Sequence, residues 1–279
     1  MIKVINTHKK MLILAVIILL ALGMVLALRV DIKTTKYYIK SNKISDSVRT
    51  ALVTDLHSCN YGEHQQKLLN KIFAEDPDFV LLGGDIVDDK LPQKKAEEFL
   101  AAIAARYPCF YVTGNHEYWS NNINDIKKMI EGYGITILEG DKVSHVVNGQ
   151  NIIICGVDDP DIGKGKFEKQ LKCFTDNIDK NSFSILLAHR PELIDKYLPY
   201  KFDLIVAGHA HGGQWRIPGI MNGLFAPNQG FFPKYAGGIY KFDDTQMIVS
   251  RGLAKESTRV PRLFNRPEVV IINIIPYIS

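Results

Sequence analysis

The sequence has few cysteines and no motif that would pair them. Its four cysteines form no Cys-x-x-Cys pair, and four in 279 residues is too sparse for a disulfide scaffold. We therefore expect buried thiols, and the cysteines do not show whether the protein lies in a reducing or an oxidising compartment. The four are Cys59, Cys109, Cys155 and Cys173.

A large excess of charge of one sign is missing too. The 34 basic and 30 acidic residues leave a net charge of +4, and no block of basic residues resembles a nucleic-acid-binding arm. The chain has neither an internal repeat nor a low-complexity tract. We therefore expect no nucleic-acid partner and one large globular domain, with the oligomeric state left open.

One long hydrophobic run interrupts this ordinary composition. Residues 11–28 carry no charge, while Lys9 and Lys10 precede them and Arg29 follows. Eighteen helical residues rise roughly 27 Å, which is close to the thickness of the hydrocarbon layer. The run lacks the polar face of a core helix. It continues past the signal-peptide-like site at residues 21–23, so we predict an uncleaved transmembrane anchor.

The run divides the chain into an N-terminal flank (1–10), the anchor (11–28), a polar linker or short leading strand (29–47) and one long domain (48–279). Lysines and arginines lie on both sides of the anchor, so the positive-inside rule does not orient it. Long domains cross membranes largely regardless of flanking charge. We favour a single-pass membrane protein whose long domain is extracytoplasmic.

Short apolar runs alternate with polar clusters and amphipathic segments after the linker. Their length and their content of β-branched and aromatic residues predict buried strands at 48–54, 79–82, 109–113, 152–157, 184–188, 203–207 and 268–275. Helical spacing of apolar residues predicts helices over 65–74, 92–106 and 122–133. Alternating strands and helices indicate an α/β layered fold.

Five of the predicted strands are followed by side chains that bind metals. In open α/β sheets the carboxyl ends of strands form the edge where ligands bind. On extended backbone, residues i and i+2 point the same way, so each Asp-x-His or His-x-His pair is expected to reach one centre. The candidate ligands are Asp55, His57, Asp85, Asn115, His189, His209 and His211.

This mixture of carboxylate, imidazole and amide side chains suits two divalent metal ions. Two ions roughly 3.5–4 Å apart generate a bridging hydroxide and clamp the oxygens of a phosphoester. Ions so close together require an anionic bridge, for which Asp85 is the natural choice. Imidazole ligands favour Mn, Fe or Zn over Mg, which prefers oxygen.

Single residues of these types usually have a structural role. An aspartate after a strand is most often a turn residue or helix N-cap, which we expect of Asp88 and Asp89. His8, His64 and His145 stand outside any cluster. Structural roles explain such residues one at a time. Only the ordered set of candidate ligands, taken together, is better explained by metal binding.

That ordered set resembles the signature of the calcineurin-like metallophosphoesterases. Its blocks are DLH (55–57), GDIVDD (84–89), GNHE (114–117), the histidine at 189 and GHAH (208–211). The resemblance extends over most of the chain after the anchor and implies a four-layer αββα sandwich, an α/β fold, preceded by the transmembrane helix. The segments 250–252 (SRG) and 266–268 (RPE) are similar to those of the family's small bacterial anchored or secreted phosphodiesterases.

The resemblance also implies a role for each residue. One metal would be bound by Asp55, His57 and His211, the other by Asn115, His189 and His209, and Asp85 would bridge them. His116 matches the family's non-ligand histidine, which contacts the phosphate and protonates the leaving oxygen. The implied activity is hydrolysis of phosphomonoesters or phosphodiesters, on a lipid or envelope-related substrate.

Two other functions use parts of the same pattern. A membrane-tethered, non-catalytic module would keep the metal ligands, but the presence of His116 disfavours it. A metal-dependent amide hydrolase would usually group its histidines as H-x-H-x-D-H, a block that this sequence lacks.

The contacts that would select a substrate are less defined. Arg190 and Arg251 suit phosphate oxygens and structural ion pairs equally. Phe231, Phe232 and Tyr235 would either form an apolar lip beside the metals or pack under a loop. The segment 58–62 receives no role.

Overall fold

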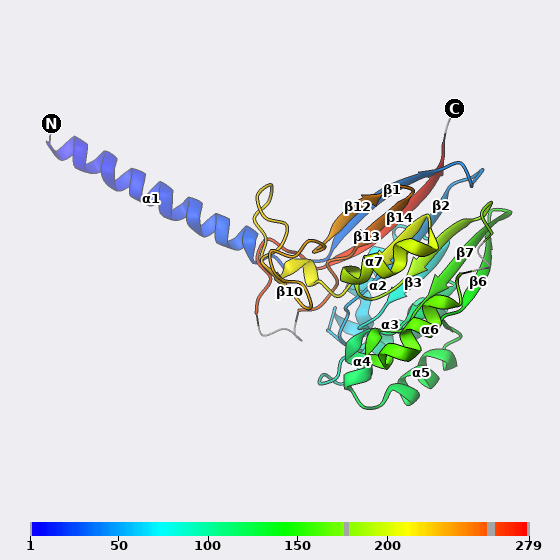
Figure 1. Cartoon of the computed structure of the whole chain (residues 1–279). Helices are drawn as coiled ribbons and strands as arrows, with labels where there is room; N and C mark the ends of the chain where they lie inside the picture. Colours follow the sequence, from blue (N-terminus) through cyan, green and yellow to red (C-terminus); the bar gives the residue numbers. More distant parts are fainter. Residues whose placement is uncertain (1, 176–178, 256–259, 278–279) are drawn as a thin grey trace.

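Two six-stranded sheets form the centre of the protein, which we describe from a computed structural model for residues 2–175, 179–255 and 260–277 (Figure 1). The first sheet has the order β1 (Lys33–Ser41), β14 (Glu268–Pro276), β2 (Val48–Val53), β3 (Phe79–Gly83), β4 (Cys109–Val112) and β5 (Thr136–Ile137). The second has the order β12 (Gly238–Phe242), β13 (Thr245–Val249), β9 (Leu204–Ala207), β8 (Phe183–Leu187), β7 (Gln150–Gly156) and β6 (Lys142–Val147). A small hairpin pairs β10 (Phe225–Ala226) with β11 (Gly230–Phe231).

Helices cover the outer face of each sheet. Apolar residues of α2 (Gln66–Phe73), α3 (Lys94–Ala104) and α5 (Ile123–Gly132) share a core with the first sheet. Those of α6 (Lys164–Lys172) and α7 (Ile194–Tyr197) share one with the second. A third core lies between the sheets. The layers therefore run helix, sheet, sheet, helix, which confirms the expected αββα sandwich.

The strands have two buried faces, which explains their uninterrupted apolar runs. Along β3, Phe79 and Leu81 belong to the core between the sheets, whereas Val80 and Leu82 belong to the core beneath the helices. Successive side chains of a strand point to opposite faces, so a central strand is apolar at every position. The neighbours β2, β3 and β4 are parallel, and so are β7, β8 and β9.

The segment expected as a linker or short leading strand contributes a nine-residue edge strand. β1 pairs in parallel with β14, from Lys33 opposite Glu268 to Ser41 opposite Pro276. Ile39 is buried between the sheets, while the neighbouring Tyr38 and Lys40 are exposed. The domain therefore begins before residue 48, because the scattered apolar residues of this segment fit a strand with one buried face.

The helix α1 (Ile2–Ala27) extends away from the rest of the protein (Figure 1). Its stretch Lys10–Ala27 is long and apolar enough to cross a membrane, and 6% of it is buried within the protein. A core helix would be mostly buried, so that alternative is excluded. A membrane span and a signal sequence both fit the helix by length and composition.

The cysteines differ in burial. Cys59, Cys109 and Cys155 are buried as expected, but Cys173, which follows α6, is exposed. The expectation of a buried thiol is wrong at Cys173 because the last turn of α6 faces solvent there.

Candidate metal centre

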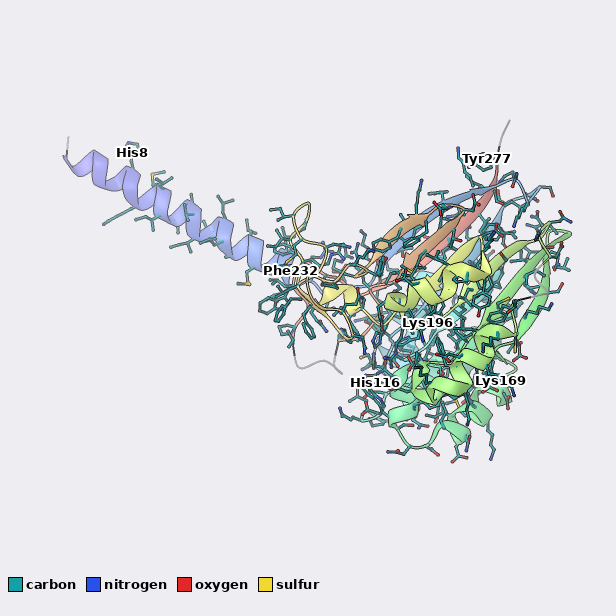
Figure 2. The ribbon with its side chains drawn as sticks, viewed as in Figure 1. His8, His116, Lys169, Lys196, Phe232 and Tyr277 are labelled. Atoms are coloured by element: carbon teal, nitrogen blue, oxygen red, sulfur yellow. The ribbon has the colours of Figure 1, made fainter. Side chains whose placement is uncertain are left out.

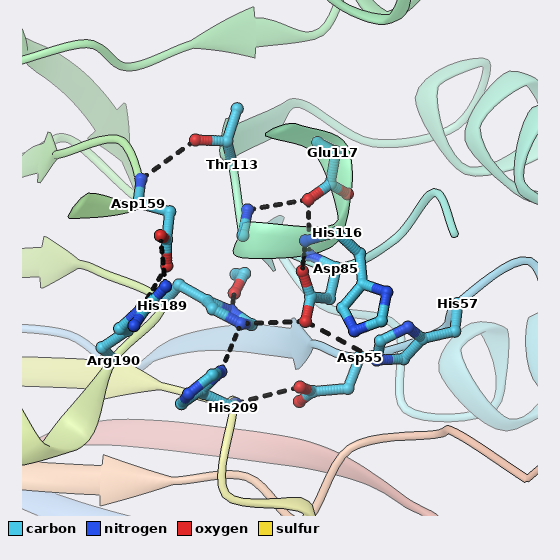
Figure 3. A network of polar contacts seen from close by, with 12 residues as sticks. Asp55, His57, Asp85, Thr113, His116, Glu117, Asp159, His189, Arg190 and His209 are labelled. Atoms are coloured by element: carbon cyan, nitrogen blue, oxygen red, sulfur yellow. Dashed lines mark hydrogen bonds and ion pairs between the residues drawn. The ribbon is translucent and has the colours of Figure 1, made fainter. Parts of the chain in front are cut away.

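The loops that follow four strands bring six of the seven predicted ligands together at one edge of the sandwich (Figure 3). Asp55 and His57 follow β2, and Asp85 follows β3. The short helix α4 (Asn115–Trp119) places Asn115 just after β4. His189 follows β8, and the pair at 209 and 211 follows β9.

Two groups of candidate ligands share one residue. In each group, the candidate ligand atoms lie within 4.8 Å of one another. Oδ2 of Asp85 lies 3.1 Å from Nε2 of His189 in one group and 3.6 Å from Nε2 of His57 in the other. Asp85 therefore occupies the position of a bridging ligand. These two groups are Asp55, His57, Asp85 and His211, and Asp85, His189 and His209; a third group, His57, Asp88 and His116, shares His57 with the first.

Several of these atoms are buried without a hydrogen-bond partner among the described residues. An unpaired buried polar atom costs about 1–3 kcal/mol. Asp55 and Asp85 are each anchored by Oδ1, which accepts a backbone N–H from His209 and His116 respectively. The remaining atoms suit divalent ions in number and chemistry, so the residues fit two metals. The unpartnered atoms are Asp55 Oδ2, His57 Nε2, Asp85 Oδ2, Asn115 Oδ1 and His211 Nδ1.

Neighbouring acceptors orient three of the four ligand imidazoles. When one ring nitrogen donates its N–H to an acceptor, the other keeps a lone pair for a metal. This leaves Nε2 of His57 and His189 and Nδ1 of His209 to face the centre. The acceptors are Asp88 Oδ1 for His57 at 2.9 Å, Gly83 O for His189 at 2.8 Å and Asn228 Oδ1 for His209 at 2.8 Å.

The local backbone is left-handed rather than extended. Asp55, His57, His209 and His211 have φ between 46° and 62°, a conformation that costs non-glycine residues about 1–3 kcal/mol each. The shared direction that extended backbone gives to residues i and i+2 therefore does not apply to these pairs. His209 and His211 fall in different groups.

Asp88 and Asp89 do more than the turn role expected of them. Oδ2 of Asp88 accepts the backbone N–H of Lys90 and of Leu91, as a turn residue does. Its Oδ1, however, faces His57, and Oδ1 of Asp89 lies 2.6 Å from Nδ1 of His116. The sequence signal was the spacing GDIVDD, which places both carboxylates one loop away from Asp85.

The electrostatics of His116 favour its protonated form. Burial lowers the pKa of His116, but the carboxylates of Asp88, Asp85 and Asp89 outweigh burial and raise that pKa to about 9. Its side chain is 19% exposed, so a molecule entering from solvent can reach it. His116 therefore lies beside the candidate metal ligands in an environment that favours a protonated imidazole.

The two histidines of the second group differ in charge. Burial lowers the pKa of His189, but Asp85 and Asp55 outweigh it and raise the value to about 10. Burial and the neighbouring His189 lower the pKa of His209 to about 3. A ligating imidazole must be neutral, so metal binding displaces a proton from His189.

Two further residues shape the ligand loops. Glu117 is fully buried, and its carboxylate accepts backbone N–H groups of Asp85, Ile86 and Val87, which holds the loop after β3 in place. Gly252 has φ +66°, and a Cβ there would lie 2.5 Å from Cβ of Asp55. The SRG segment thus lets the chain pass directly behind a metal ligand.

The candidate substrate contacts separate into different roles. Arg190 is buried, with Nε 2.7 Å from Asp159 Oδ2 (Figure 3), and is a structural ion pair. Arg251 lies 3.7 Å from the buried carboxylate of Glu268. Tyr235 is buried under its loop, whereas Phe231 and Phe232 are both 71% exposed.

Comparison with known proteins gives related sequences and solved structures of related fold. A profile of the family described as calcineurin-like phosphoesterase matches residues 48–213. An uncharacterized metallophosphoesterase of Bacillus subtilis (strain 168), YkuE, is 28% identical over 87% of this chain and 85% of its own. One from Aquifex aeolicus (strain VF5) is 28% identical over 87% and 92%. The phosphopantetheinyl hydrolase PptH of Mycobacterium tuberculosis shares the fold, with a TM-score of 0.50, 13% identity and coverage of 80% and 96%.

Proposed function

Because the chain belongs to the calcineurin-like phosphoesterase family, and is a metal-dependent phosphoesterase, we propose that it acts as a membrane-tethered, two-metal hydrolase of phosphomonoesters or phosphodiesters. The shared position of Asp85 between two groups of buried ligands carries this proposal. The metals are Mn, Fe or Zn, since four of the seven ligands are imidazoles.

The ligand residues define where a phosphoester would bind. When bound, two divalent ions supply activation of a water molecule and neutralisation of charge on the phosphoryl oxygens. Asp85 keeps the two positions close together, and the buried partners of His57 and His189 hold their rings toward them. The loops around the edge of the sheets exclude water from the far side of this centre, where the ligands are almost fully buried.

His116 supplies the proton for the leaving group. The carboxylates of Asp88, Asp85 and Asp89 raise the pKa of the imidazole, which favours its protonated form, and Asp89 holds Nδ1. The remaining ring nitrogen is thereby directed away from Asp89 and can donate to an alkoxide as it leaves. This is general acid catalysis by a positioned side chain.

We further propose a lipid or envelope-related substrate and an extracytoplasmic catalytic domain. The exposed stretch of α1 supports the tether, and Phe231 and Phe232 support an apolar substrate. A lipid phosphoester would stay in the bilayer while its head group reaches the metals.

The test replaces the shared carboxylate. Asp85→Asn should fold, lose one or both metals by elemental analysis, and fall to background on p-nitrophenyl phosphate and bis-p-nitrophenyl phosphate. The matched control is Asp244→Asn, which lies exposed in the turn between β12 and β13 and should keep both metals and turnover. Wild-type activity in Asp85→Asn, or after complete metal removal, would refute the two-metal proposal.

A further inference from the structure

A group of exposed apolar side chains is concentrated in two segments, 215–232 and 260–264. Outside α1, fifteen large apolar side chains are exposed in the described part of the chain, and eight of them come from these segments. Ile220 is 83% exposed, and Phe231 and Phe232 are 71% exposed. Such clustering on a soluble surface marks a contact site. This loop surface consists of Trp215, Ile217, Ile220, Phe225, Phe231, Phe232, Val260 and Phe264.

Contacts between the two segments make them one surface. Trp215 forms a β-bridge with Leu263, and its Nε1 donates to the carbonyl of Pro261 at 2.9 Å. The rings of Phe225 and Phe231 lie 5.4 Å apart across the β10–β11 hairpin. The exposed residues therefore belong to a folded unit rather than to separate loops.

This loop surface begins where α1 ends. The backbone N–H of Phe264 donates to the carbonyl of Ala27, in the last turn of α1, at 2.7 Å. Figure 2 shows Phe232 beside that end of the helix, with Tyr277 at the opposite end of the domain. The apolar run of α1 stops at Leu28, and Arg29 follows it. If α1 spans a bilayer, the membrane surface lies at this level.

We propose that the loop surface lies in the interfacial layer of the lipid bilayer that α1 spans. Aromatic and aliphatic side chains are stabilised at the boundary between head groups and acyl chains, where apolar area leaves water. The contact rests on the membrane tether of the proposed function and adds a second attachment to it. The domain is thereby held at a fixed orientation instead of moving freely about its anchor.

A basic cavity at the same level fits the head groups of anionic phospholipids. The cavity, about 540 Å³, lies between residues 30–32, shortly after the end of α1, and the lysines Lys67, Lys71 and Lys255. Its acidic residue, Asp31, is already paired with Arg29 and Arg266. Basic residues near a membrane surface attract anionic lipids.

The loop surface also reaches the metal centre. Asn228 lies in the turn of the β10–β11 hairpin, between Phe225 and Phe231, and its Oδ1 is 2.8 Å from Nε2 of His209. A single hairpin therefore contacts the bilayer with its rings and a candidate metal ligand with its turn. The contact brings the metal centre to the membrane surface.

The experiment measures the depth of single positions in the full chain reconstituted into nanodiscs. Cys173→Ser removes the exposed native thiol, and the other three cysteines are buried. Ile220→Cys and Phe231→Cys, each labelled with an environment-sensitive dye, are then compared in lipids that carry a nitroxide quencher near the head group. Val146→Cys in β6, 65% exposed and far from α1 (Figure 1), is the matched control. Leu19→Cys, 67% exposed in the middle of the apolar stretch of α1, reports the tether in lipids that carry the nitroxide near the end of the acyl chain.

We expect severalfold stronger quenching and blue-shifted emission at positions 220 and 231 relative to position 146. Quenching at position 19 combined with none above the control at 220 and 231 would overturn the loop contact while leaving the tether intact. Absence of quenching at position 19 would overturn the tether and the contact with it.

A second arm tests the cavity. Quenching at position 220 should increase when phosphatidylglycerol replaces part of the phosphatidylcholine, and Lys67→Gln with Lys71→Gln should remove that increase. No dependence on phosphatidylglycerol in the parent protein would overturn the role of the cavity.

Discussion

The metal centre and the loop surface both reverse the usual distribution of residues, in opposite directions. The metal centre buries polar groups: Asp55 is fully buried and His211 is 7% exposed. The loop surface exposes apolar groups, from 39% at Trp215 to 83% at Ile220. Each arrangement is unfavourable for the chain alone, since buried polar atoms lack partners and apolar atoms meet water. Each therefore fits the partner proposed for it, cations in one region and lipid in the other.

The two regions also differ in the contacts that support their side chains and loops. Residues of the metal centre are supported by buried partners such as Glu117 and Asp88, which fix loops and rings. The side chains of the loop surface have few such supports and project outward. Changes in the first region should therefore act on chemistry, and changes in the second on membrane contact alone.

Removal of the metals should have the largest effect, and it should act on the metal centre. A chelator should reduce hydrolysis of bis-p-nitrophenyl phosphate to background and lower the Tm, because unpaired carboxylates and imidazoles then remain buried. Readdition of Mn, Fe or Zn should restore both. Activity that persists in metal-free protein, verified by elemental analysis, would contradict this prediction.

His116→Gln should have the next largest effect. Loss of a positioned proton donor should lower kcat about 10²- to 10⁴-fold, with metal content unchanged because the proposal places His116 outside the ligand set. His64→Gln, at a side chain 73% exposed, is the matched control and should behave as the parent. Loss of metal together with activity would assign His116 to the ligand set instead.

Substitution of Asp88 should have a smaller effect on activity, because Asp88 acts by orienting the ring of His57. Asp88→Ala removes the acceptor that orients the His57 ring, and metal affinity or activity should fall about 10- to 100-fold. Asp88→Asn keeps an acceptor oxygen and should lose less, as titration of metal against activity would reveal. Equal losses in the two variants would point to the charge of Asp88 rather than to its hydrogen bond.

Exposed and buried rings should differ in how much their removal lowers the free energy of unfolding. Phe231→Ala removes a ring that is 71% exposed, and unfolding free energy should change by less than about 0.5 kcal/mol. Phe99→Ala removes a fully buried ring between α3 and the first sheet and should cost about 3–5 kcal/mol. Denaturant unfolding in detergent measures both, and comparable losses would show that Phe231 packs within the domain.

Much of the fold was predictable because the strands have two buried faces. The runs at 79–82 and 204–207 are apolar at every position, and a central strand of a layered sandwich demands that pattern. The edge strand β1 was harder to identify, because only one of its faces is buried and its lysines gave it the composition of a linker.

The candidate site was predictable in its residue types but not in its supports. Asp, His and Asn after strand ends are unusual in combination, so the ligands could be named from order alone. Asn228 is a single amide in a loop 19 residues after His209, and nothing in its neighbours marks it. The buried partners of Arg190 and Glu117 likewise come from distant loops.

The sequence by itself determined the family, the layered fold, the candidate ligand residues and the apolar helix, because each is carried by a local pattern or an ordered series. Only the tertiary structure decided which ligands share Asp85, which ring nitrogens face the centre and where the exposed aromatic residues lie relative to α1. Those features depend on contacts between segments far apart in the chain. A left-handed backbone at His209 and a hydrogen bond from Phe264 to Ala27 exist only once the sheets have brought their ends together.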